Sequence, residues 1–196
     1  MKKFTSTLFI IFLIFSTKAL AADNEMVKRI SEGKESAKIT IIAYESLTCG
    51  HCANFHKDVL PELKKDFIDK GLVKIEFRHF PLDLAAFNAS KIAQCNNDGN
   101  SNILHILYSG QKKWARGKTP EEATGYLKKF LESESVNLDF EKCLSDKAIE
   151  DFVLNDRIDG VKKFEVNATP TIIINDKKFD KALNYKNLKK YLEKLI

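Results

Sequence analysis

The hydrophobic and polar positions of the chain alternate between strand-like and helix-like patterns. An apolar, β-branched run within residues 38–48 predicts a buried strand, and alternation over residues 72–78 predicts a second strand. Between them, apolar side chains recur at intervals of three and four residues, which predicts a helix with one buried face. The apolar positions of this helix are Cys52, Phe55, Val59, Leu60, Leu63 and Phe67. Pro61 lies inside the helix and should kink it, because proline has no backbone N–H to donate.

The stretch that follows the second strand shows helical spacing only, so residues 84–157 are expected to form an all-helical subdomain inserted into an α/β fold. A capping box at residues 119–122, with proline at the first helical position, marks the start of one helix. The expected helices cover residues 84–95, 101–114 and 119–131, one from about residue 139, and one that carries residues 149–164.

After this region the strand pattern returns. Residues 172–174 and 177–179, joined by a polar turn, predict a hairpin, and residues 183–196 predict a closing amphipathic helix. No internal repeat or low-complexity linker divides the chain. The expected organisation is a first part of the α/β domain over 22–83, the helical insertion over 84–157 and a second part over 158–196.

The N-terminus has the pattern of a secretory signal peptide. A basic start is followed by uninterrupted apolar residues 8–15 and by the small residues of a cleavage site at 19–21. We therefore expect an exported, periplasmic protein with a cleaved signal peptide over residues 1–21. An uncleaved signal that anchors the protein to the membrane is the alternative, although the apolar core is short for a span. The polar residues 23–38 are expected to be loosely ordered, with the apolar Met26, Val27 and Ile30 as the exception.

Net charge gives no indication of a charged partner. The formal net charge is +5, but Lys2, Lys3 and Lys18 lie in the expected signal peptide, and the rest of the chain is close to +2. A balance so near neutrality points neither to nucleic acid nor to an anionic membrane surface. All four cysteines lie beyond the signal peptide, and an even number in an exported protein favours disulfides.

Two cysteines separated by two residues stand where the first strand gives way to the helix. Cys49 is expected at the helix N-terminus, where unpaired backbone N–H groups and the helix dipole favour its thiolate. His51 can add a positive charge or a hydrogen bond to the same sulfur. Cys52 falls on the apolar stripe of the helix and should point inward. Because thiolates attack disulfides, Cys49 is predicted to be the nucleophile and Cys52 the resolving thiol of a redox pair.

A second feature lies far from this pair in the sequence. Thr169 and Pro170 precede the β-branched residues 171–174, and a proline that opens a strand is often cis. A strand, a Cys-x-x-Cys at the start of a helix and a much later Thr-Pro before a strand together resemble the pattern of a thioredoxin fold. We expect Pro170 to be cis and the backbone of Thr169 to pair with an extended substrate. An ordinary trans proline is the alternative.

The cysteines and histidines also have structural interpretations. A zinc site would need a second Cys-x-x-Cys or a pair of histidines, and haem attachment would need histidine directly after the second cysteine, where alanine stands. We therefore expect no metal and no cofactor. Cys95 and Cys143 are interpreted as a structural disulfide, with a regulatory disulfide as the alternative. His56, His79 and His105 are interpreted as surface or packed residues, because no acidic or thiol side chain is spaced with them.

Three stretches of the chain resemble a known family. Residues 44–56, 77–82 and 166–171 are similar to the corresponding stretches of the DsbA-type exported disulfide oxidoreductases, especially those of alphaproteobacteria. With the helical insertion included, the resemblance covers nearly all of the chain after the signal peptide. It implies a thioredoxin-like α/β fold with an inserted all-helical subdomain.

The resemblance also assigns roles by position. Cys49 would be the nucleophile, Cys52 the resolving thiol and His51 the stabiliser of the thiolate. The residues expected to lie against the substrate are Gly50, Thr169 and Pro170.

The chain departs from the family pattern between the cysteines. Gly50 stands where the family commonly has proline, and Gly-His is the dipeptide typical of protein disulfide isomerases. Reduction potentials of about −120 mV for DsbA and about −180 mV for the isomerase bracket the expectation for this chain. It is therefore expected to oxidise less strongly than DsbA and to isomerise more readily.

A second departure concerns an acidic side chain. The family often has glutamate where this chain has Ala43, and Glu45 occupies a position that is usually small. Because residues two apart share a strand face, Glu45 can still reach the buried side of the site. Our hypothesis is that Glu45 relays protons to Cys52. A solvated carboxylate beyond the end of the strand is the alternative.

The expected function is the oxidation of thiols outside the cytoplasm. In this interpretation the Cys49–Cys52 disulfide is donated to unfolded or reduced exported proteins. The family resemblance implies that a quinone-linked thiol oxidase of the membrane then restores it. The protein is expected to act as a monomer, because no dimerisation segment precedes the α/β unit, and nucleic acid is not an expected partner.

Two other functions remain open. A disulfide isomerase or reductase kept reduced by a thiol donor would use the same two cysteines in the opposite redox state. A binding protein that holds peptides or delivers copper would belong to a different class. Copper carriers of this fold typically have Cys-x-x-x-Cys with a distant histidine, a pattern that this chain lacks, and a holdase would survive Cys49→Ser.

Overall fold

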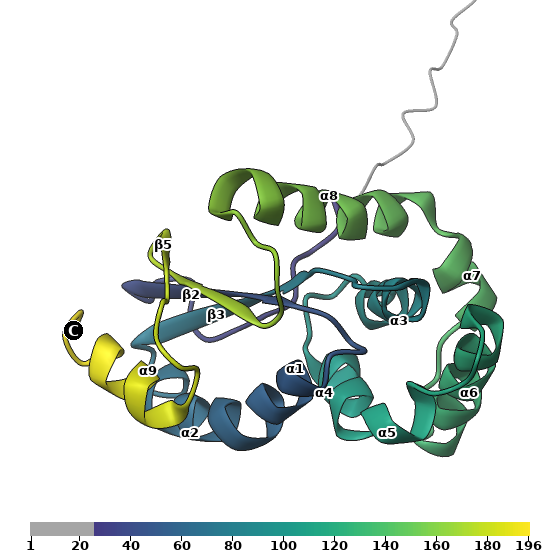
Figure 1. Cartoon of the computed structure of the whole chain (residues 1–196), viewed down its shortest axis with the longest axis horizontal. Coiled ribbons are helices and arrows are strands. Elements are labelled where there is room, and N and C mark those ends of the chain that lie inside the picture. The colour runs from purple at the N-terminus through teal and green to yellow at the C-terminus, as the bar shows by residue number, and fades with distance from the viewer. Residues whose placement is uncertain (1–25) are drawn as a thin grey trace, which may run out of the picture.

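A mixed β-sheet lies at the centre of the computed structural model, which describes residues 26–196 (Figure 1). Within these residues the sheet has five strands in the order β1-β3-β2-β4-β5. The strands are β1 (Ser31–Glu32), β2 (Ile39–Glu45), β3 (Val73–His79), β4 (Thr171–Ile174) and β5 (Lys177–Lys178). The signal peptide expected over residues 1–21 lies outside the described part of the chain.

The register of the central strand brings two distant segments of the chain together. β2 pairs in parallel with β3, with Ala43 opposite Phe77, and antiparallel with β4, with Tyr44 opposite Thr171. The chain therefore leaves β2 at the same edge of the sheet at which it enters β4. This pairing places the Cys-x-x-Cys that follows β2 beside the Thr-Pro that precedes β4.

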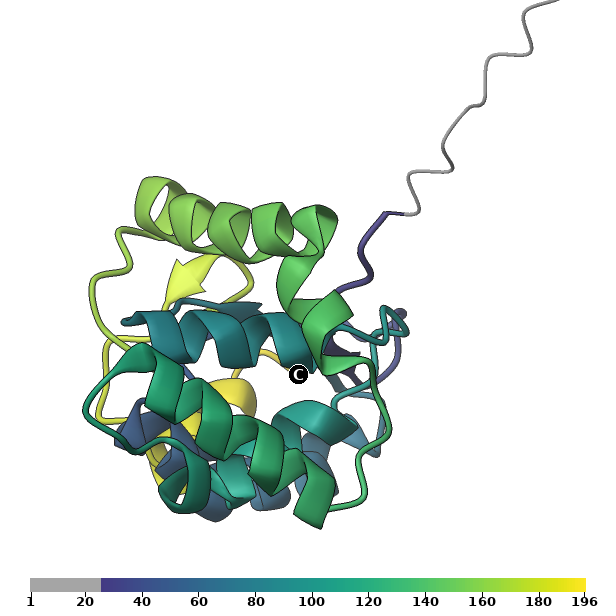
Figure 2. The ribbon, with the colours of Figure 1, turned by 90° about the vertical axis from the view of Figure 1, so that its right-hand side faces the viewer.

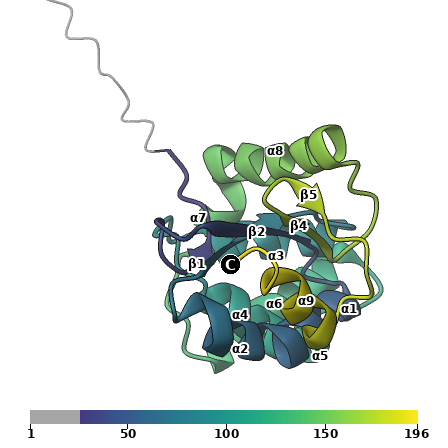
Figure 3. The ribbon, with the colours of Figure 1, turned by 90° about the vertical axis from the view of Figure 1, so that its left-hand side faces the viewer.

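Helices cover both faces of the sheet and extend the molecule at one end. In Figure 3, α8 (Lys147–Phe164) lies above the sheet, and α2 (Leu60–Leu63) and α9 (Tyr185–Leu192) lie below it. The remaining helices gather at the end of the sheet that Figure 2 turns towards the viewer. They are α3 (Leu84–Gln94), α4 (Asn102–Ser109), α5 (Gln111–Trp114), α6 (Pro120–Ser133) and α7 (Phe140–Ser145).

The helix after β2 runs from Gly50 to Ile68 and mixes α-helical with π-helical turns. Its segments are α1 (Gly50–Asn54), the π-helical η1 (Phe55–Val59), α2 (Leu60–Leu63) and the π-helical η2 (Lys64–Ile68). Pro61 stands in the first turn of α2, directly after η1. Because a wider turn accommodates a residue that has no N–H to donate, the irregularity expected at Pro61 takes the form of a π-helical turn.

One of the predicted helices is divided. The helix expected over residues 101–114 turns at Gly110, which separates α4 from α5. A β-carbon at Gly110 would lie 1.9 Å from Cζ of Phe130, so only glycine allows the chain to approach α6 this closely. Of the predicted capping box the N-cap is present, because the hydroxyl of Thr119 accepts the N–H of Glu122 at 3.2 Å at the start of α6. The Glu122 carboxylate accepts the N–H of Lys118 at 2.7 Å in place of the N–H of Thr119.

α8 packs directly on the sheet and is continuous over its 18 residues. A β-carbon at Gly160 would lie 2.7 Å from Cε1 of Tyr44 in β2, so the helix backbone nearly touches the ring. The boundary expected between residues 157 and 158 falls inside this helix. The division of the chain into domains therefore stays a prediction.

The expectation of loose order for residues 23–38 is wrong at Arg29 and at β1, whereas Ile30 is ordered in agreement with the expected exception. Ile30 is 1 % exposed, and its carbonyl accepts the N–H of Phe77 at 3.0 Å. Ser31 in β1 pairs antiparallel with Glu76 in β3, and Arg29 forms an ion pair with Asp156 of α8 at 2.7 Å. The outer edge of β3 offers backbone hydrogen bonds that local polarity does not reveal.

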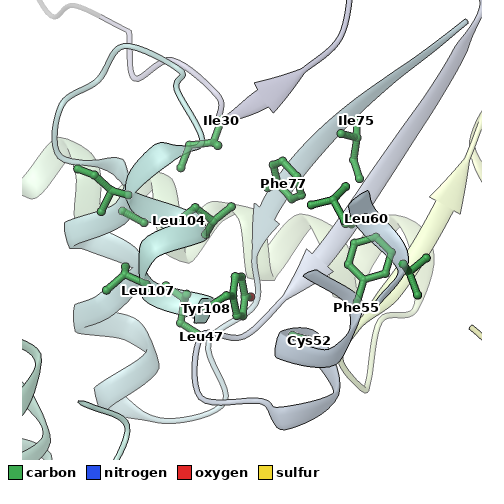
Figure 4. Packing of buried hydrophobic residues seen from close by; sticks show 14 of the residues in the cluster. Ile30, Leu47, Cys52, Phe55, Leu60, Ile75, Phe77, Leu104, Leu107 and Tyr108 are labelled. Atoms are coloured by element: carbon green, nitrogen blue, oxygen red, sulfur yellow. The ribbon is translucent and has the colours of Figure 1, made fainter. Parts of the chain in front are cut away.

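The main hydrophobic core fills the space between the sheet, the helix after β2 and α4 (Figure 4). Cys52 belongs to this core and lies beside Phe55, and Leu107 and Tyr108 of α4 close it from the other side. A smaller cluster lies on the opposite face of the sheet and comprises Ile42, Tyr44, Phe80, Val166 and Ile173. Within residues 26–196, no helix combines the length and the apolar character that crossing a membrane requires.

Cys95 and Cys143 form the expected disulfide, which joins the end of α3 to α7 across a sequence separation of 48 residues. We predict that Cys95→Ala/Cys143→Ala lowers the free energy of unfolding by about 4 kcal/mol, because the cross-link restricts the unfolded chain. Urea denaturation would measure this loss, with Cys49→Ser and Cys52→Ser present in both proteins so that the second pair does not contribute. A loss below about 1 kcal/mol would contradict the prediction.

Candidate active site

The two cysteines that follow β2 differ in their access to solvent. Cys49 is half-buried at the N-terminal end of α1, where its N–H donates to the carbonyl of Ser46 at 3.0 Å and its carbonyl accepts the N–H of Ala53 at 3.2 Å. Cys52 is 0 % exposed, as its place on the apolar stripe predicted. A substrate sulfur can therefore reach Cys49 and not Cys52.

The Thr169–Pro170 peptide bond is cis, and it lies beside Cys49. The thiol of Cys49 donates to the carbonyl of Thr169 at 3.3 Å, across 120 residues of sequence. The hydroxyl of Thr169 is buried and makes no hydrogen bond within the described part of the chain, so it is available to the sulfur. The predicted proximity of Cys-x-x-Cys and Thr-Pro is therefore present.

The surroundings of Cys49 favour its thiolate. Its pKa is lowered to about 5, first by a hydrogen bond from the Cys52 thiol, then by the Thr169 side chain and the backbone amides of Cys52 and His51. Partial burial acts in the opposite direction and does not cancel these effects. At neutral pH Cys49 is a thiolate, which is the nucleophilic form of cysteine.

The surroundings of Cys52 have the opposite effect. Burial raises the pKa of Cys52 far above its usual range, and its hydrogen bond to Cys49 and the negative charge of Glu45 raise it further. Cys52 is therefore a thiol at every physiological pH in the reduced protein. In the reduced protein the pair therefore consists of a Cys49 thiolate and a Cys52 thiol.

The two residues between the cysteines are exposed. The group of His51 that lowers the pKa of Cys49 is its backbone amide. The side chain of His51 lines the pockets on both sides of the site, where a bound molecule would meet it. A β-carbon at Gly50 would meet no atom within 4 Å, so this position is open to an approaching chain.

Gln111 supports the loop that carries Cys49, and sequence analysis missed it. Its side-chain Nε2 donates to the carbonyl of Leu47 at 2.8 Å and to the carbonyl of Cys49 at 3.0 Å. Gln111 is only 8 % exposed at the start of α5. Nothing in its sequence neighbourhood distinguishes it from a surface glutamine, because its role depends on how α5 packs against the loop.

Glu45 ends β2 and is 4 % exposed, so the interpretation as a solvated carboxylate is wrong. Its Oε2 accepts the Nε2–H of His56 at 2.8 Å. Its Oε1 is buried without a hydrogen-bond partner in the described part of the chain. The carboxylate therefore keeps one oxygen available within the electrostatic reach of Cys52.

Two histidines interpreted as surface or packed residues are bonded to acids. Nδ1 of His56 faces Nδ1 of His105 at 3.2 Å, and Nε2 of His105 lies 2.5 Å from Oε1 of Glu32. Together with the Glu45 contact, these distances describe a continuous chain of four titratable side chains. Helix packing creates it, because its members come from β1, β2, η1 and α4. His79 is a packed residue, as expected, and lies 3.4 Å from Oε1 of Gln94.

Pockets flank Cys49 on both sides. The larger, of about 1130 Å³, is lined by Gly50, His51, Glu32, His56 and His105, among others. A smaller pocket of about 500 Å³ is lined by His51, Thr169, Pro170 and Tyr185, among others. Among residues 26–196, no three His, Cys, Asp or Glu side chains are placed to hold a metal ion together.

Comparisons with known proteins give this geometry a context. A family model described as thioredoxin matches residues 25–194. Disulfide bond formation protein D of Bacillus subtilis is 30 % identical over 172 residues, which are 83 % of this chain and 74 % of that protein. The crystal structure of Wolbachia pipientis alpha-DsbA1 superposes with a TM-score of 0.75 at 29 % identity and covers 85 % of this chain and 90 % of its own.

A protein of Rickettsia bellii that bears the provisional name protein-disulfide oxidoreductase is 30 % identical over 158 residues. The matched region is 78 % of this chain but only 58 % of the Rickettsia bellii protein, so the chain spans little more than half of that relative. The structural likeness confirms the fold that the sequence predicted, a thioredoxin-like α/β fold with a run of helices between β3 and β4.

In the reduced protein, we predict that alkylation of Cys49 by iodoacetamide accelerates with pH about a midpoint near 5. The thiolate that reacts is present above this pH and is lost below it. Mass spectrometry of quenched samples would give the rate at each residue, with Cys52→Ala as a control in which the midpoint rises because the first-ranked hydrogen bond is gone. A wild-type midpoint near 8.5, the value of a free thiol, would refute the assignment.

Proposed function

Because the chain belongs to the thioredoxin family, in its DsbA-type branch, we propose that it is an exported thiol:disulfide oxidoreductase. It introduces disulfides into secreted or periplasmic proteins through Cys49 and Cys52. The observation that carries the proposal is the contrast between the two sulfurs. Cys49 is accessible and stabilised as a thiolate beside Thr169, whereas Cys52 is sealed in the core as a thiol.

The reaction begins with the oxidised Cys49–Cys52 pair. A substrate thiolate attacks Sγ of Cys49, forms a mixed disulfide and displaces Sγ of Cys52, which takes up a proton. A second substrate thiolate then attacks the substrate sulfur of the mixed disulfide and releases Cys49 as a thiolate. The substrate loses two electrons and the active-site pair gains them. The step is favourable because the released Cys49 thiolate is stabilised where it forms.

The cis-proline segment is the proposed binding surface for the substrate chain. The thiol form of Cys49 donates to the carbonyl of Thr169, whereas a thiolate or a mixed disulfide has no hydrogen to donate and leaves this carbonyl free to accept a backbone N–H of the substrate. The open surface at Gly50 and the pockets on either side leave room for the substrate backbone. Gly50, Thr169 and Pro170 are therefore the proposed substrate contacts.

The proposed location is the periplasm, after removal of residues 1–21, and the protein acts there as a monomer. Its substrates are unfolded or reduced exported proteins. Each turnover leaves Cys49 and Cys52 reduced, so the cycle requires a partner that accepts two electrons. A quinone-linked thiol oxidase of the membrane has the chemistry that this step needs.

A disulfide isomerase or reductase is the second candidate function. It is favoured by one observation, the Gly50-His51 dipeptide between the cysteines, which is typical of isomerases. Such an enzyme acts from its reduced form, in which the Cys49 thiolate attacks a wrong disulfide of the substrate. The redox potential of the pair separates the two functions.

We predict a reduction potential for Cys49–Cys52 near or above about −180 mV, because the low pKa of Cys49 stabilises the reduced form. Equilibration in glutathione buffers, followed by alkylation and mass analysis, would measure it with Cys95 and Cys143 left in place. The Cys49→Ser variant is the control for activity, since it should abolish the oxidation of a reduced substrate protein. A potential near about −270 mV, as in thioredoxin, would overturn the oxidase assignment.

Glu45→Gln tests the proposed catalytic role of Glu45. The change removes the negative charge that helps to raise the pKa of Cys52, and it removes a group able to donate a proton to its sulfur. We predict an exchange rate lower by about tenfold or more and an altered pH profile. The control is Glu35→Gln, which changes an exposed carboxylate paired with Lys74. An unchanged pH profile together with unchanged thiol pKa values would exclude this role.

A further inference from the structure

The reduction of Cys52 poses a problem of proton supply. When the Cys49–Cys52 disulfide opens, Cys52 leaves with the electron pair of the broken bond and must gain one proton. Cys49 needs none, because its thiolate is stable at neutral pH. Cys52 is 0 % exposed and lies within the hydrophobic core, so solvent does not reach its sulfur directly. The proton must be delivered by a neighbouring side chain.

A row of hydrogen-bonded side chains runs from the neighbourhood of Cys52 to the larger pocket. Glu45 lies 2.8 Å from His56, His56 lies 3.2 Å from His105, and His105 lies 2.5 Å from Glu32. The exposed fraction of the side chain rises from 3 % for Glu45 and 5 % for His56 to 36 % for His105, and it is 12 % for Glu32. The last three members line the pocket that opens beside Cys49.

The geometry of this row fixes how many protons it holds. A carboxylate can only accept, so Nε2 of His56 and Nε2 of His105 each carry a hydrogen toward Glu45 and Glu32. Two bare Nδ1 atoms 3.2 Å apart would repel each other, so one further hydrogen lies between them. Two imidazoles then share three ring protons between two carboxylates. Such an arrangement can pass a proton along by short shifts within each hydrogen bond.

We propose that Glu45, His56, His105 and Glu32 form a proton relay that supplies Cys52 from the pocket when the Cys49–Cys52 disulfide is reduced. The proposal deepens the function proposed above and rests on it. Glu45 is the member whose charge acts on the reacting sulfur, and its Oε1 is buried without a hydrogen-bond partner in the described part of the chain. His56, His105 and Glu32 act through it and are positioning residues.

Each step of the relay conserves protons. The Cys52 thiolate takes the proton of a protonated Glu45, which has received it from Nε2 of His56. His56 keeps at Nδ1 the hydrogen that it shared with Nδ1 of His105, and a proton from the pocket, which both histidines line, replaces the ring proton that the pair has lost. Glu32 stays ionised and holds the Nε2–H of His105 in place. One proton therefore enters from the pocket for each one delivered to Cys52, and no electron moves along the row.

Within residues 26–196, Lys64, Tyr108 and the two active-site cysteines are the other charged or titratable groups that act on the relay. Nζ of Lys64 in η2 lies 3.7 Å from Oε2 of Glu32, and Lys64 is also paired with Asp69. Against the effect of burial, hydrogen bonds from His105 and Ser101 and then the charges of His105 and Lys64 lower the pKa of Glu32 to about 2. The ring of Tyr108 stacks on His56 with centroids 3.9 Å apart, and burial raises its pKa well above the usual range. Cys49 and Cys52 are the titratable groups at the inner end.

His105→Gln and Glu32→Gln test the relay at its accessible end, where a substitution leaves the core intact. The oxidised protein is mixed with a reduced two-cysteine peptide, quenched with acid at short times and alkylated, and mass analysis gives the rate of disulfide opening. We expect both variants to be slower by about tenfold or more at pH 8. The deficit should shrink as the pH falls, because protons then become abundant without a relay. Glu35→Gln is the matched control for Glu32→Gln.

Imidazole distinguishes a relay from a structural role. His105 lines a pocket of about 1130 Å³, so free imidazole can enter the space that His105→Ala creates. Added imidazole should restore the opening rate of His105→Ala and leave the wild type unchanged. A slow variant with neither a changed pH profile nor rescue would show that His105 is only structural, and the proposal would then be wrong. Rates for His105→Gln and Glu32→Gln within twofold of Glu35→Gln would overturn it equally.

Failure of the relay and failure of the proposed function give different results. If the wild-type protein oxidises the peptide and Cys49→Ser does not, the proposed function stands whatever the histidine variants do. If the wild type itself does not react, both proposals fall. Nitrogen NMR of the histidines gives an independent measurement, since the relay requires one proton bound between Nδ1 of His56 and Nδ1 of His105. A spectrum with both Nδ1 atoms unprotonated at neutral pH would contradict it.

Discussion

The antiparallel pairing of β2 with β4 is the interaction on which the site depends. Cys49 and Thr169 are 120 residues apart, and only this ladder brings the end of one strand beside the start of the other. Because side chains alternate along a strand, a shift of the register by one residue would exchange the side chains that β4 presents to the two clusters on opposite faces of the sheet. The helices between β3 and β4 leave the sheet and return to it without disturbing this pairing.

The same fold separates two sulfurs three residues apart into different surroundings. Cys49 meets donors at the tip of a helix, whereas Cys52 meets hydrophobic side chains and the charge of Glu45. A buried carboxylate is costly unless it is hydrogen-bonded, and His56 supplies that bond. Glu45 is thus retained in the core by a partner that can also exchange protons with it. The same packing arrangement therefore gives Cys49 and Cys52 different pKa values and buries the Glu45 carboxylate.

Local spacing was enough to predict β2, β3, the hairpin of β4 and β5, the helix after β2 and the inward direction of Cys52, since these depend on neighbouring residues. The position of Thr169 and Pro170 beside the Cys-x-x-Cys was predictable because these two distant motifs together resemble the pattern of a thioredoxin fold. The contact of His56 with His105 was not, because it depends on how α4 packs beside η1, and Glu32 joins them from an edge strand that polarity had concealed. Gly110 shows the same limit, since its close approach to Phe130 follows from helix packing.

The amide of Gln111 has a mechanical consequence for the loop before α1. One nitrogen holds the carbonyls of Leu47 and Cys49 together, so this loop can move outward only by breaking two hydrogen bonds in a buried place. The helices at the end of the sheet thereby restrain the backbone that carries the nucleophilic Cys49. The backbone that carries Cys49 is therefore already fixed before a substrate binds. The entropy of ordering this backbone is lost once, when the chain folds.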